Sequence, residues 1–277
     1  MSDTLRATFR RVLRLENRRQ AIRPGRIERI HGFESKILGN QRELTIYLPP
    51  GYDDRPERRY PVLYIQDGQN LFDADRAYVP GQHWRLHEAA DAAIGERTAS
   101  PMIIVGIDHA GIGRMEEYTP AKDQKHNGGG RASDYARMLA EELKPMIDER
   151  FRTLGDPANT AVAGSSLGGL FSLHAILTRR DVFERAAAIS PSVWWADRAI
   201  LQTVDAYDGP PPRLLVDIGG REGLEALRDA RDLRDRIVKK GWSEEHFHYY
   251  EDRRADHSER AWAKRVRLVL EFLFPPA

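Results

Sequence analysis

Residues 161–175 read A-V-A-G-S-S-L-G-G-L-F-S-L-H-A, and they contain the pattern G-x-S-x-G with Ser166 at its centre. The residues before the motif predict a strand over Thr160–Ala163, and those after it predict a helix over Leu167–Leu177. A serine at such a strand-to-helix turn has a strained backbone and an exposed hydroxyl, which is the position of a nucleophile. The alternative is a serine that caps an ordinary helix.

The residues around Ser166 carry separate expectations. Glycines flank it because a Cβ at those positions would clash with neighbouring backbone. The backbone N–H of Leu167, at the helix N-terminus, can face a developing oxyanion. Ser165 ends the strand and is expected to point sideways or inward. His174 lies two turns along the helix, so it is expected to be a packed residue out of reach of the Ser166 hydroxyl.

The rest of the chain alternates between strand and helix patterns, which predicts an α/β fold. Two strands within residues 30–49 form an antiparallel hairpin, and the buried run P-V-L-Y-I begins at Pro61. Strands separated by helices imply a mostly parallel sheet with helices on both faces and the hairpin at its N-terminal edge. A single domain over residues 29–277 is the simplest organisation. Further strands are predicted at Met102–Ile107, Arg185–Ile189, Arg213–Ile218 and His246–Glu251, and further helices at His83–Ile94, Ala132–Phe151 (kinked at Pro145), Arg198–Ala206, Leu224–Lys240 and Glu259–Phe274.

The composition excludes several classes of protein. The 277 residues include 43 Lys and Arg against 42 Asp and Glu, so no bulk charge attracts nucleic acid. The absence of cysteine removes disulfides, thiolate metal sites and a cysteine nucleophile. No run approaches the roughly 18 apolar residues of a membrane span, and no apolar signal core follows the first residues. We therefore expect a cytoplasmic protein.

Residues 1–28 are predicted to be a basic, amphipathic helical extension. Leu5, Phe9, Val12 and Leu13 fall on one helical face, with arginines largely around it. Such a helix can bind a membrane surface or a partner. It can equally dock on its own domain or on a second copy of the chain, so a homo-oligomer is one option.

A serine nucleophile needs a neighbouring base, and nine histidines are available. In this fold class the chain order is serine, acid, histidine, with the histidine on a loop after the last strand. Only His257 satisfies this order, and Asp256 with Glu259 is interpreted as a capping box that fixes its loop. His83 and His87 have a spacing that suits a metal, but no HExxH pattern accompanies them, so neither a metal nor a cofactor is expected.

The acid is expected after the strand that precedes the strand of the histidine. The stretch R-L-L-V-D-I-G-G-R-E-G offers Asp217 inside the strand and Glu222 on the loop beyond its carboxyl end, where catalytic groups of such sheets collect. Glu222 is favoured, and its role would be to orient the imidazole and stabilise the imidazolium. Asp217, Glu225 and Asp229 remain alternatives, as does a serine–histidine dyad.

The second oxyanion donor is expected on the loop Q-D-G-Q-N-L-F-D, which follows the strand P-V-L-Y-I. Gly68 lets the chain turn tightly there, and the backbone N–H of Gln69 is the candidate donor. Asp67 and Gly68 are expected to border the substrate.

Substrate contacts are expected from two further segments. The loop over residues 110–131 carries Arg114 and Tyr118 and follows the carboxyl end of a strand, which suits recognition of an anionic or phenolic acyl group. The alternative is a solvated surface loop with scattered charges. Trp194 and Trp195 follow another strand, and we expect one to line the acyl pocket and the other to belong to the core.

Six stretches stand in order between about Ile30 and Phe274: L-Y-I-Q-D-G-Q-N-L-F-D, G-R-M-E-E-Y-T-P, G-G-G-R, E-L-K-P-M-I-D, G-S-S-L-G-G-L-F-S-L-H and S-P-S-V-W-W. Together they resemble the esterase D and enterochelin-esterase family of α/β-hydrolases, which includes feruloyl and acetylxylan esterases, siderophore trilactone hydrolases and mycolyltransferases. The resemblance implies an α/β-hydrolase fold with Ser166 as nucleophile, His257 as base, and Leu167 and Gln69 as oxyanion donors. It also implies an acid near G-G-R-E.

These observations predict a serine esterase that cleaves a small acyl, aromatic or siderophore-type ester through an acyl-serine intermediate. The same machinery could transfer the acyl group to a sugar or alcohol, because water and an alcohol attack the same acyl-enzyme. A third hypothesis is a non-catalytic binding protein that retains the fold.

Overall fold

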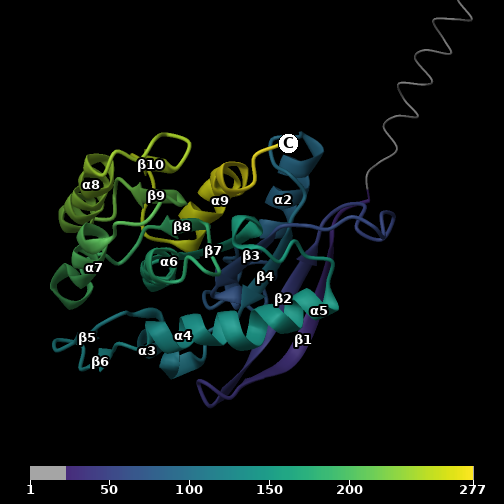
Figure 1. Cartoon of the computed structure of the whole chain (residues 1–277), viewed down its shortest axis with the longest axis horizontal. Coiled ribbons are helices and arrows are strands. Elements are labelled where there is room, and N and C mark those ends of the chain that lie inside the picture. The colour runs from purple at the N-terminus through teal and green to yellow at the C-terminus, as the bar shows by residue number, and fades with distance from the viewer. Residues whose placement is uncertain (1–22, 277) are drawn as a thin grey trace, which may run out of the picture.

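The computed structural model describes residues 23–276, and these build an eight-stranded sheet with helices on both sides (Figure 1). The strands follow the order β1-β2-β4-β3-β7-β8-β9-β10. β2 pairs antiparallel with β1 and with β4, whereas the other neighbours in the sheet are parallel. The predicted mostly parallel sheet with an antiparallel N-terminal edge is therefore confirmed.

The elements have the following bounds. The strands of the sheet are β1 (Arg26–Ser35), β2 (Asn40–Leu48), β3 (Val62–Gln66), β4 (Ile103–Ile107), β7 (Thr160–Ser165), β8 (Arg185–Ile189), β9 (Arg213–Gly219) and β10 (Phe247–Asp252), while β5 (Lys122–Asp123) and β6 (Gly128–Gly129) form a separate small hairpin. The helices are α2 (Leu86–Gly95), α3 (Arg114–Tyr118), α4 (Ala132–Met138), α5 (Lys144–Arg150), α6 (Leu167–Thr178), α7 (Trp195–Ala206), α8 (Leu224–Lys239) and α9 (Glu259–Leu273), with a short 3-10 turn, η1 (Gly68–Asn70), after β3.

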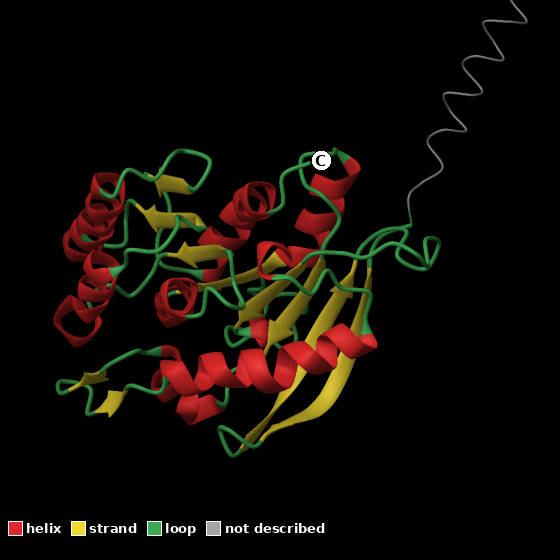
Figure 2. Cartoon of the chain, in the orientation of Figure 1, coloured by secondary structure: helices red, strands yellow, loops and turns green. Residues whose placement is uncertain are grey.

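The sheet separates two hydrophobic cores. Alternate residues of β3 face opposite sides, so Val62 and Tyr64 pack in one core and Leu63 and Ile65 in the other. Helices α2 and α9 cover the second core, and α4 to α8 cover the first, which gives the three layers visible in Figure 2. Both faces of the central strands are buried, as their continuous apolar runs predict.

Two predicted boundaries, the starts of β1 and α2, differ by three residues or more, whereas the regular part of α7 begins close to the predicted residue 198. β1 begins at Arg26, inside the segment expected to be helical, and the helical prediction for residues 1–22 lies outside the described residues. α2 begins at Leu86 rather than at residue 83. Arg85, directly before it, has a left-handed backbone with φ 52°, so the helix does not extend to earlier residues. At the start of α7, residues 196–198 are also left-handed, so the regular helix begins only after Arg198.

The helix predicted over residues 132–151 is continuous but contains one widened turn. Residues Leu139–Leu143 form a π-helical turn between α4 and α5, and the backbone N–H of Lys144 donates to the oxygen of Leu139. Pro145, one residue later, has no N–H to donate, so the regular ladder is interrupted at this point. The predicted irregularity is thus present, as a π turn placed just before the proline.

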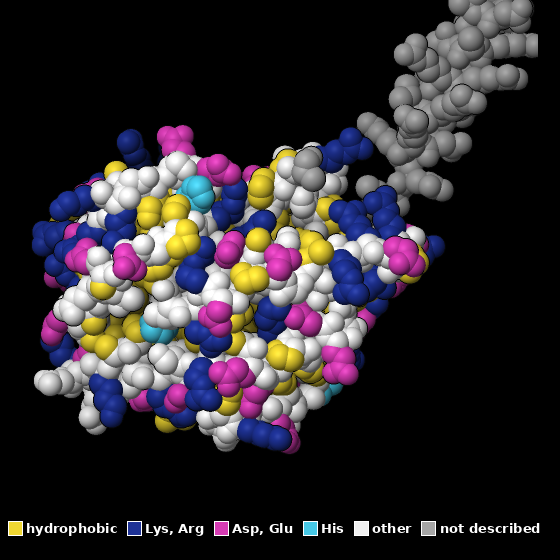
Figure 3. Space-filling view, in the orientation of Figure 1, with side chains coloured by type: hydrophobic (Ala, Val, Ile, Leu, Met, Phe, Trp, Pro, Cys, Tyr) yellow, Lys and Arg dark blue, Asp and Glu magenta, His cyan; other side chains and the backbone are white. Residues whose placement is uncertain are grey.

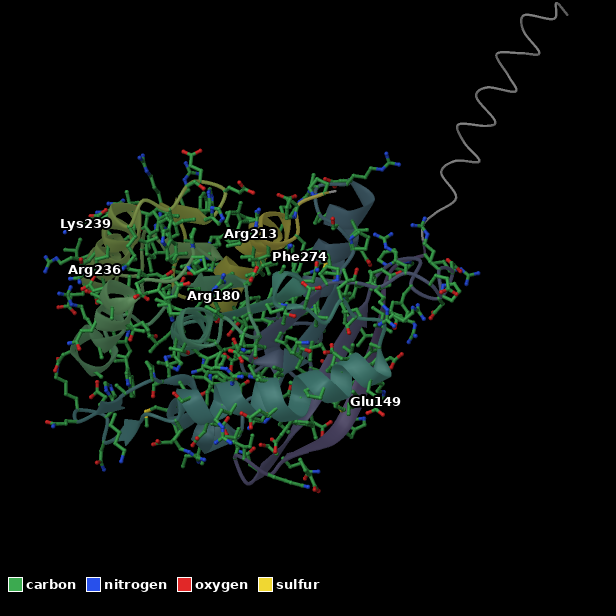
Figure 4. All side chains as sticks on the ribbon, in the orientation of Figure 1. Glu149, Arg180, Arg213, Arg236, Lys239 and Phe274 are labelled. Atoms are coloured by element: carbon green, nitrogen blue, oxygen red, sulfur yellow. The ribbon has the colours of Figure 1, made fainter. Side chains whose placement is uncertain are left out.

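The amino ends of the parallel strands carry contacts that stabilise the fold. Arg213, at the start of β9, lies near the end of α9 and Phe274 (Figure 4). Its guanidinium donates to the oxygen of Phe272 at 3.1 Å, which caps the C-terminus of α9.

On the face shown in Figure 3, basic and acidic side chains are interspersed. No helix within residues 23–276 is long and apolar enough to cross a membrane.

Candidate active site

Ser166 occupies a strained turn between β7 and α6. Its φ and ψ are 58° and −120°, a backbone conformation that non-glycine residues rarely adopt. Its N–H donates to the oxygen of Ile189 at 2.9 Å, which fixes the turn against β8. A Cβ at Gly164 would lie 2.8 Å from the backbone of Gly168, so the predicted need for glycine holds there. At Gly168 the nearest obstacle, the Gln66 side chain, is 3.2 Å away.

The fold brings His257 to Ser166 across 91 residues of sequence. The Nε2 atom of His257 lies 3.0 Å from the Oγ atom of Ser166, and its Nδ1 atom lies 2.6 Å from Oε2 of Glu222. The imidazole also stands edge-on to the indole of Trp262, with ring centroids 4.8 Å apart. Serine, histidine and glutamate therefore form a continuous hydrogen-bonded chain at the carboxyl edge of the sheet.

Glu222 is held by contacts on both of its oxygens. Its Oε1 accepts hydrogen bonds from the N–H of Gly219 at 2.7 Å and from the hydroxyl of Ser190 at 2.6 Å. Burial of the side chain raises its pKa, but the hydrogen bonds from His257 and Ser190 outweigh burial and hold the pKa below its ordinary value. Glu222 is therefore ionised at neutral pH and faces the histidine as a carboxylate.

The other carboxylates considered for this role lie elsewhere. Asp217 is fully buried and binds the Nε and Nη2 atoms of Arg265 at 2.8 and 3.2 Å. Arg265 in turn donates to the Ser190 hydroxyl at 2.9 Å, and that hydroxyl donates to Glu222. Asp217 therefore acts on Glu222 only indirectly, through Arg265 and Ser190. Asp229, a buried residue of α8, accepts from Arg198 at 3.2 Å. The structure places only Glu222 at His257 among these candidates.

The two candidate oxyanion donors are the backbone N–H groups of Leu167 and Gln69. Leu167 opens α6 and Gln69 lies in the first turn of η1, so neither N–H has a partner within its own helix. Gly68 lies where a Cβ would be 2.6 Å from the backbone of Ile107, and Asp67 before it is left-handed with φ 58°. The tight turn expected at Gly68 is present, and Gln69 after it lines the same pocket as Ser166.

A pocket of about 430 Å³ lies over Ser166 and His257. Arg114 lines it and donates to both carboxylate oxygens of Asp67, at 2.7 and 2.8 Å. The guanidinium also lies over the ring of Tyr118, 5.1 Å from its centroid. Because Asp67 offsets its charge, Arg114 contributes a positioned donor to the wall rather than a free cation.

The structure does not bring every candidate substrate contact to this pocket. Tyr118 is fully buried beneath Arg114. Trp195 is also buried, and its indole N–H donates to the oxygen of Ala121 at 2.7 Å, whereas Trp194 is 44% exposed. The expectation that one tryptophan belongs to the core therefore fits Trp195. His174 is buried in α6 as expected, and burial lowers its pKa to about 4.

Several residues of the site carried no sequence signal. The Ser192 hydroxyl lies 3.3 Å from that of Ser166, and His109 lines the pocket from the loop after β4. The capping box is wrong in detail: Ser258, not Asp256, caps α9 by accepting the N–H of Ala261 at 3.3 Å. Glu259 instead turns toward the pocket, because buried hydrogen-bond donors there satisfy its carboxylate.

A serine at a strand–helix turn, with a histidine and a carboxylate on later loops of a mostly parallel sheet, defines an α/β-hydrolase. The sequence model of the family Esterase, described as "Putative esterase", matches residues 35–270. The chain therefore belongs to this esterase family, and it is a carboxylic ester hydrolase.

Known relatives agree with this placement. The chain is 26% identical to the uncharacterized protein YbbA of Bacillus subtilis, over 88% of this chain and 96% of the relative. It is 27% identical to the ferri-bacillibactin esterase BesA of Bacillus subtilis, over 76% of this chain and 78% of the relative. The crystal structure of the BES protein from Bacillus cereus superimposes with a TM-score of 0.72 at 25% identity, covering 90% of this chain and 94% of that one.

Proposed function

We propose that the chain hydrolyses carboxylic esters through an acyl-enzyme on Ser166. The Oγ atom attacks the ester carbonyl carbon while Nε2 of His257 removes its proton. His257 then returns this proton to the departing alcohol. In the second half, a water molecule gives a proton to His257 and attacks the acyl carbon, and His257 returns that proton to the Ser166 oxygen as the acid leaves. The supporting observation is the unbroken chain of contacts, 3.0 Å from serine to histidine and 2.6 Å from histidine to Glu222.

The proposed roles of the remaining groups follow from charge. The tetrahedral intermediate carries a negative oxygen, and the N–H groups of Leu167 and Gln69 are the proposed donors to it. His257 becomes positively charged at the same moment. The ionised Glu222 stabilises that cation and, by accepting a hydrogen bond from Nδ1–H, keeps Nε2 free to act as a base. No step requires a metal or an organic cofactor.

The surroundings of the pocket support an ester with a sizeable apolar or aromatic part. Tyr78, Ile112, Trp194 and Leu224 are large apolar side chains exposed to solvent. Tyr78 lines the pocket, whereas Ile112, Trp194 and Leu224 follow β4, β8 and β9 at the carboxyl edge of the sheet, where β7 and Ser166 also end. Such a rim suits aromatic or siderophore-type esters, in line with the ferri-bacillibactin esterase among the relatives.

Substitution of Ser166 tests the proposal. Ser166→Ala should lower kcat/KM for p-nitrophenyl acetate by at least about 10³-fold, because the nucleophile is lost. Ser133→Ala is the matched control, since Ser133 also lies beside a histidine but on α4, outside the lining of this pocket, and it should retain full activity. Normal turnover by Ser166→Ala would sink the assignment.

A substrate panel on the wild-type protein then sharpens it. The panel covers the candidate substrate classes: methyl ferulate, acetylated xylan, short and long acyl esters and a catechol trilactone. Repeating the assay with an added polyol separates hydrolysis from acyl transfer. Free acid as the main product supports hydrolysis, and an acylated polyol would show that the same acyl-enzyme serves a transferase.

A further inference from the structure

Glu259 lies in the wall of the catalytic pocket without a part in the proposed reaction. It is the first residue of α9, two positions after His257. Its Oε1 accepts a hydrogen bond from the side-chain amide of Asn70 at 3.0 Å, and its Oε2 accepts one from the indole N–H of Trp84. Each oxygen of this carboxylate is thus bonded to the segment that follows β3.

That segment carries the proposed oxyanion donor. Asn70 is the neighbour of Gln69, and its side-chain oxygen accepts the N–H of Tyr78 at 2.8 Å. Its backbone oxygen accepts the N–H of Trp84 at 2.8 Å. Asn70 and Trp84 therefore close the loop on itself, and their side chains donate together to Glu259. A shift of the carboxylate would be transmitted to the peptide that bears the Gln69 N–H.

We propose that Glu259 is a positioning residue that ties the oxyanion loop, residues 67–70, to the loop that carries His257. This inference rests on the proposed function, because it assigns the Gln69 N–H to the oxyanion. The tie fixes the distance between two parts of the site that belong to opposite ends of the chain. The general base and the oxyanion donor then stay aligned on one substrate.

The tie depends on the charge of Glu259. Asn70 and Trp84 offer only N–H groups, so an ionised carboxylate accepts both, whereas a proton on either oxygen would oppose one of them. Burial raises the pKa of Glu259 to about 7, the hydrogen bond from Trp84 opposes this rise, and the charge of Asp67 adds to it. Arg114 and His257, which also face Glu259, favour its ionised form. The tie therefore strengthens as pH rises through neutrality.

The variant Glu259→Gln tests this role on the full chain. Glutamine keeps one acceptor but presents an amide to the other donor, so kcat for p-nitrophenyl acetate should fall by about 10- to 100-fold, with KM nearly unchanged. Glu271→Gln is the matched control, because Glu271 lies on the same helix and accepts from Arg267 at 2.7 Å, far from the pocket. It should leave kcat unchanged.

The pH profile separates positioning from a merely structural role. In the wild type, ionisation of Glu259 near pH 7 should contribute to the acid limb of log kcat/KM. In Glu259→Gln this contribution is removed, so the acid limb should become less steep. A folded Glu259→Gln protein with wild-type kcat and a wild-type profile would overturn the proposal, whatever its thermal stability.

Asn70→Ala provides a second route if Glu259→Gln folds poorly. It removes one donor to the carboxylate, and it should lower kcat with the same small effect on KM. The double variant should lose little more than the worse single variant, because both act through one bond. Multiplied losses would contradict the tie. Retained activity in Ser166→Ala would instead refute the proposed function itself, so the two failures are distinguishable.

Discussion

Within residues 23–276, two contacts join a serine hydroxyl to the Nε2 atom of a histidine. In one, Nε2 of His257 lies 3.0 Å from the hydroxyl of Ser166, and in the other, Nε2 of His174 lies 3.4 Å from the hydroxyl of Ser133. Behind His257 stands the carboxylate of Glu222, whereas Nδ1 of His174 is buried without a hydrogen-bond partner among the described residues. Burial accordingly lowers the pKa of His174 to about 4.

This difference is the reason why we propose only the first pair as catalytic. A histidine that acts as a base must carry a positive charge in the transition state, and only a partner such as Glu222 stabilises that charge. The backbone of Ser166 also differs, because its strained turn presents the hydroxyl to the pocket. Ser133 lies within the regular helix α4 and has no such turn.

The largest effect is expected from removing the carboxylate behind His257. Glu222→Gln makes this pair resemble the one at His174, and it should lower kcat for p-nitrophenyl acetate by about 10²- to 10⁴-fold, since the imidazolium loses its counter-ion. Circular dichroism should confirm that the variant is folded. Unchanged kcat in a folded variant would mean that the site works as a serine–histidine dyad.

A smaller effect on rate is expected at Asp217, whose partner is arginine rather than histidine. Asp217→Asn removes the nearer of the two carboxylates that face the buried Arg265, the other being Glu222, and it should lower the free energy of unfolding by about 3 kcal/mol, measured by urea titration. The rate of the folded protein should fall less than about tenfold, because Glu222 remains in place. A loss as large as that of Glu222→Gln would show that the two acids share one role.

The smallest effect on catalysis is expected at the second pair. His174→Gln and Ser133→Ala should leave kcat unchanged, but the histidine variant should alter the pH dependence of stability. The pKa of His174 is about 4 in the folded protein and about 6.5 in the unfolded chain, so between these pH values only the unfolded chain binds the proton. The wild-type free energy of unfolding should therefore fall by roughly 3 kcal/mol as pH drops from about 6.5 to about 4.

Urea titrations across this pH range check that expectation. The free energy of unfolding of the wild type, relative to that of His174→Gln, should fall by roughly 3 kcal/mol as pH drops from about 6.5 to about 4. A difference that stays constant with pH would contradict the assignment of His174 as a buried neutral residue.

The sequence was sufficient for features that depend on local pattern or chain order. The motif around Ser166 and the alternation of strands and helices are local, and the positions of His257 and Glu222 follow from the ends of β10 and β9. Parallel strands end at the same edge of the sheet, so residues on these loops meet whatever their distance along the chain.

Features that depend on side-chain packing could not be predicted. The contacts of Ser190 with Glu222 and Arg265 join three segments, and no spacing in the sequence signals them. Glu259 suggested a capping box because its local spacing fits one, but buried donors more than 170 residues away determine its direction. Tyr118 suggested a substrate contact, and the packing of Arg114 over its ring buries it.

Covalent capture tests the central claim most directly. Diethyl p-nitrophenyl phosphate should transfer one phosphoryl group to each chain, release one equivalent of p-nitrophenol and abolish esterase activity. Peptide mass spectrometry should find the adduct on Ser166, and Glu222→Gln should form it far more slowly. An adduct on Ser133 or Ser165, or full activity after stoichiometric labelling, would contradict the account.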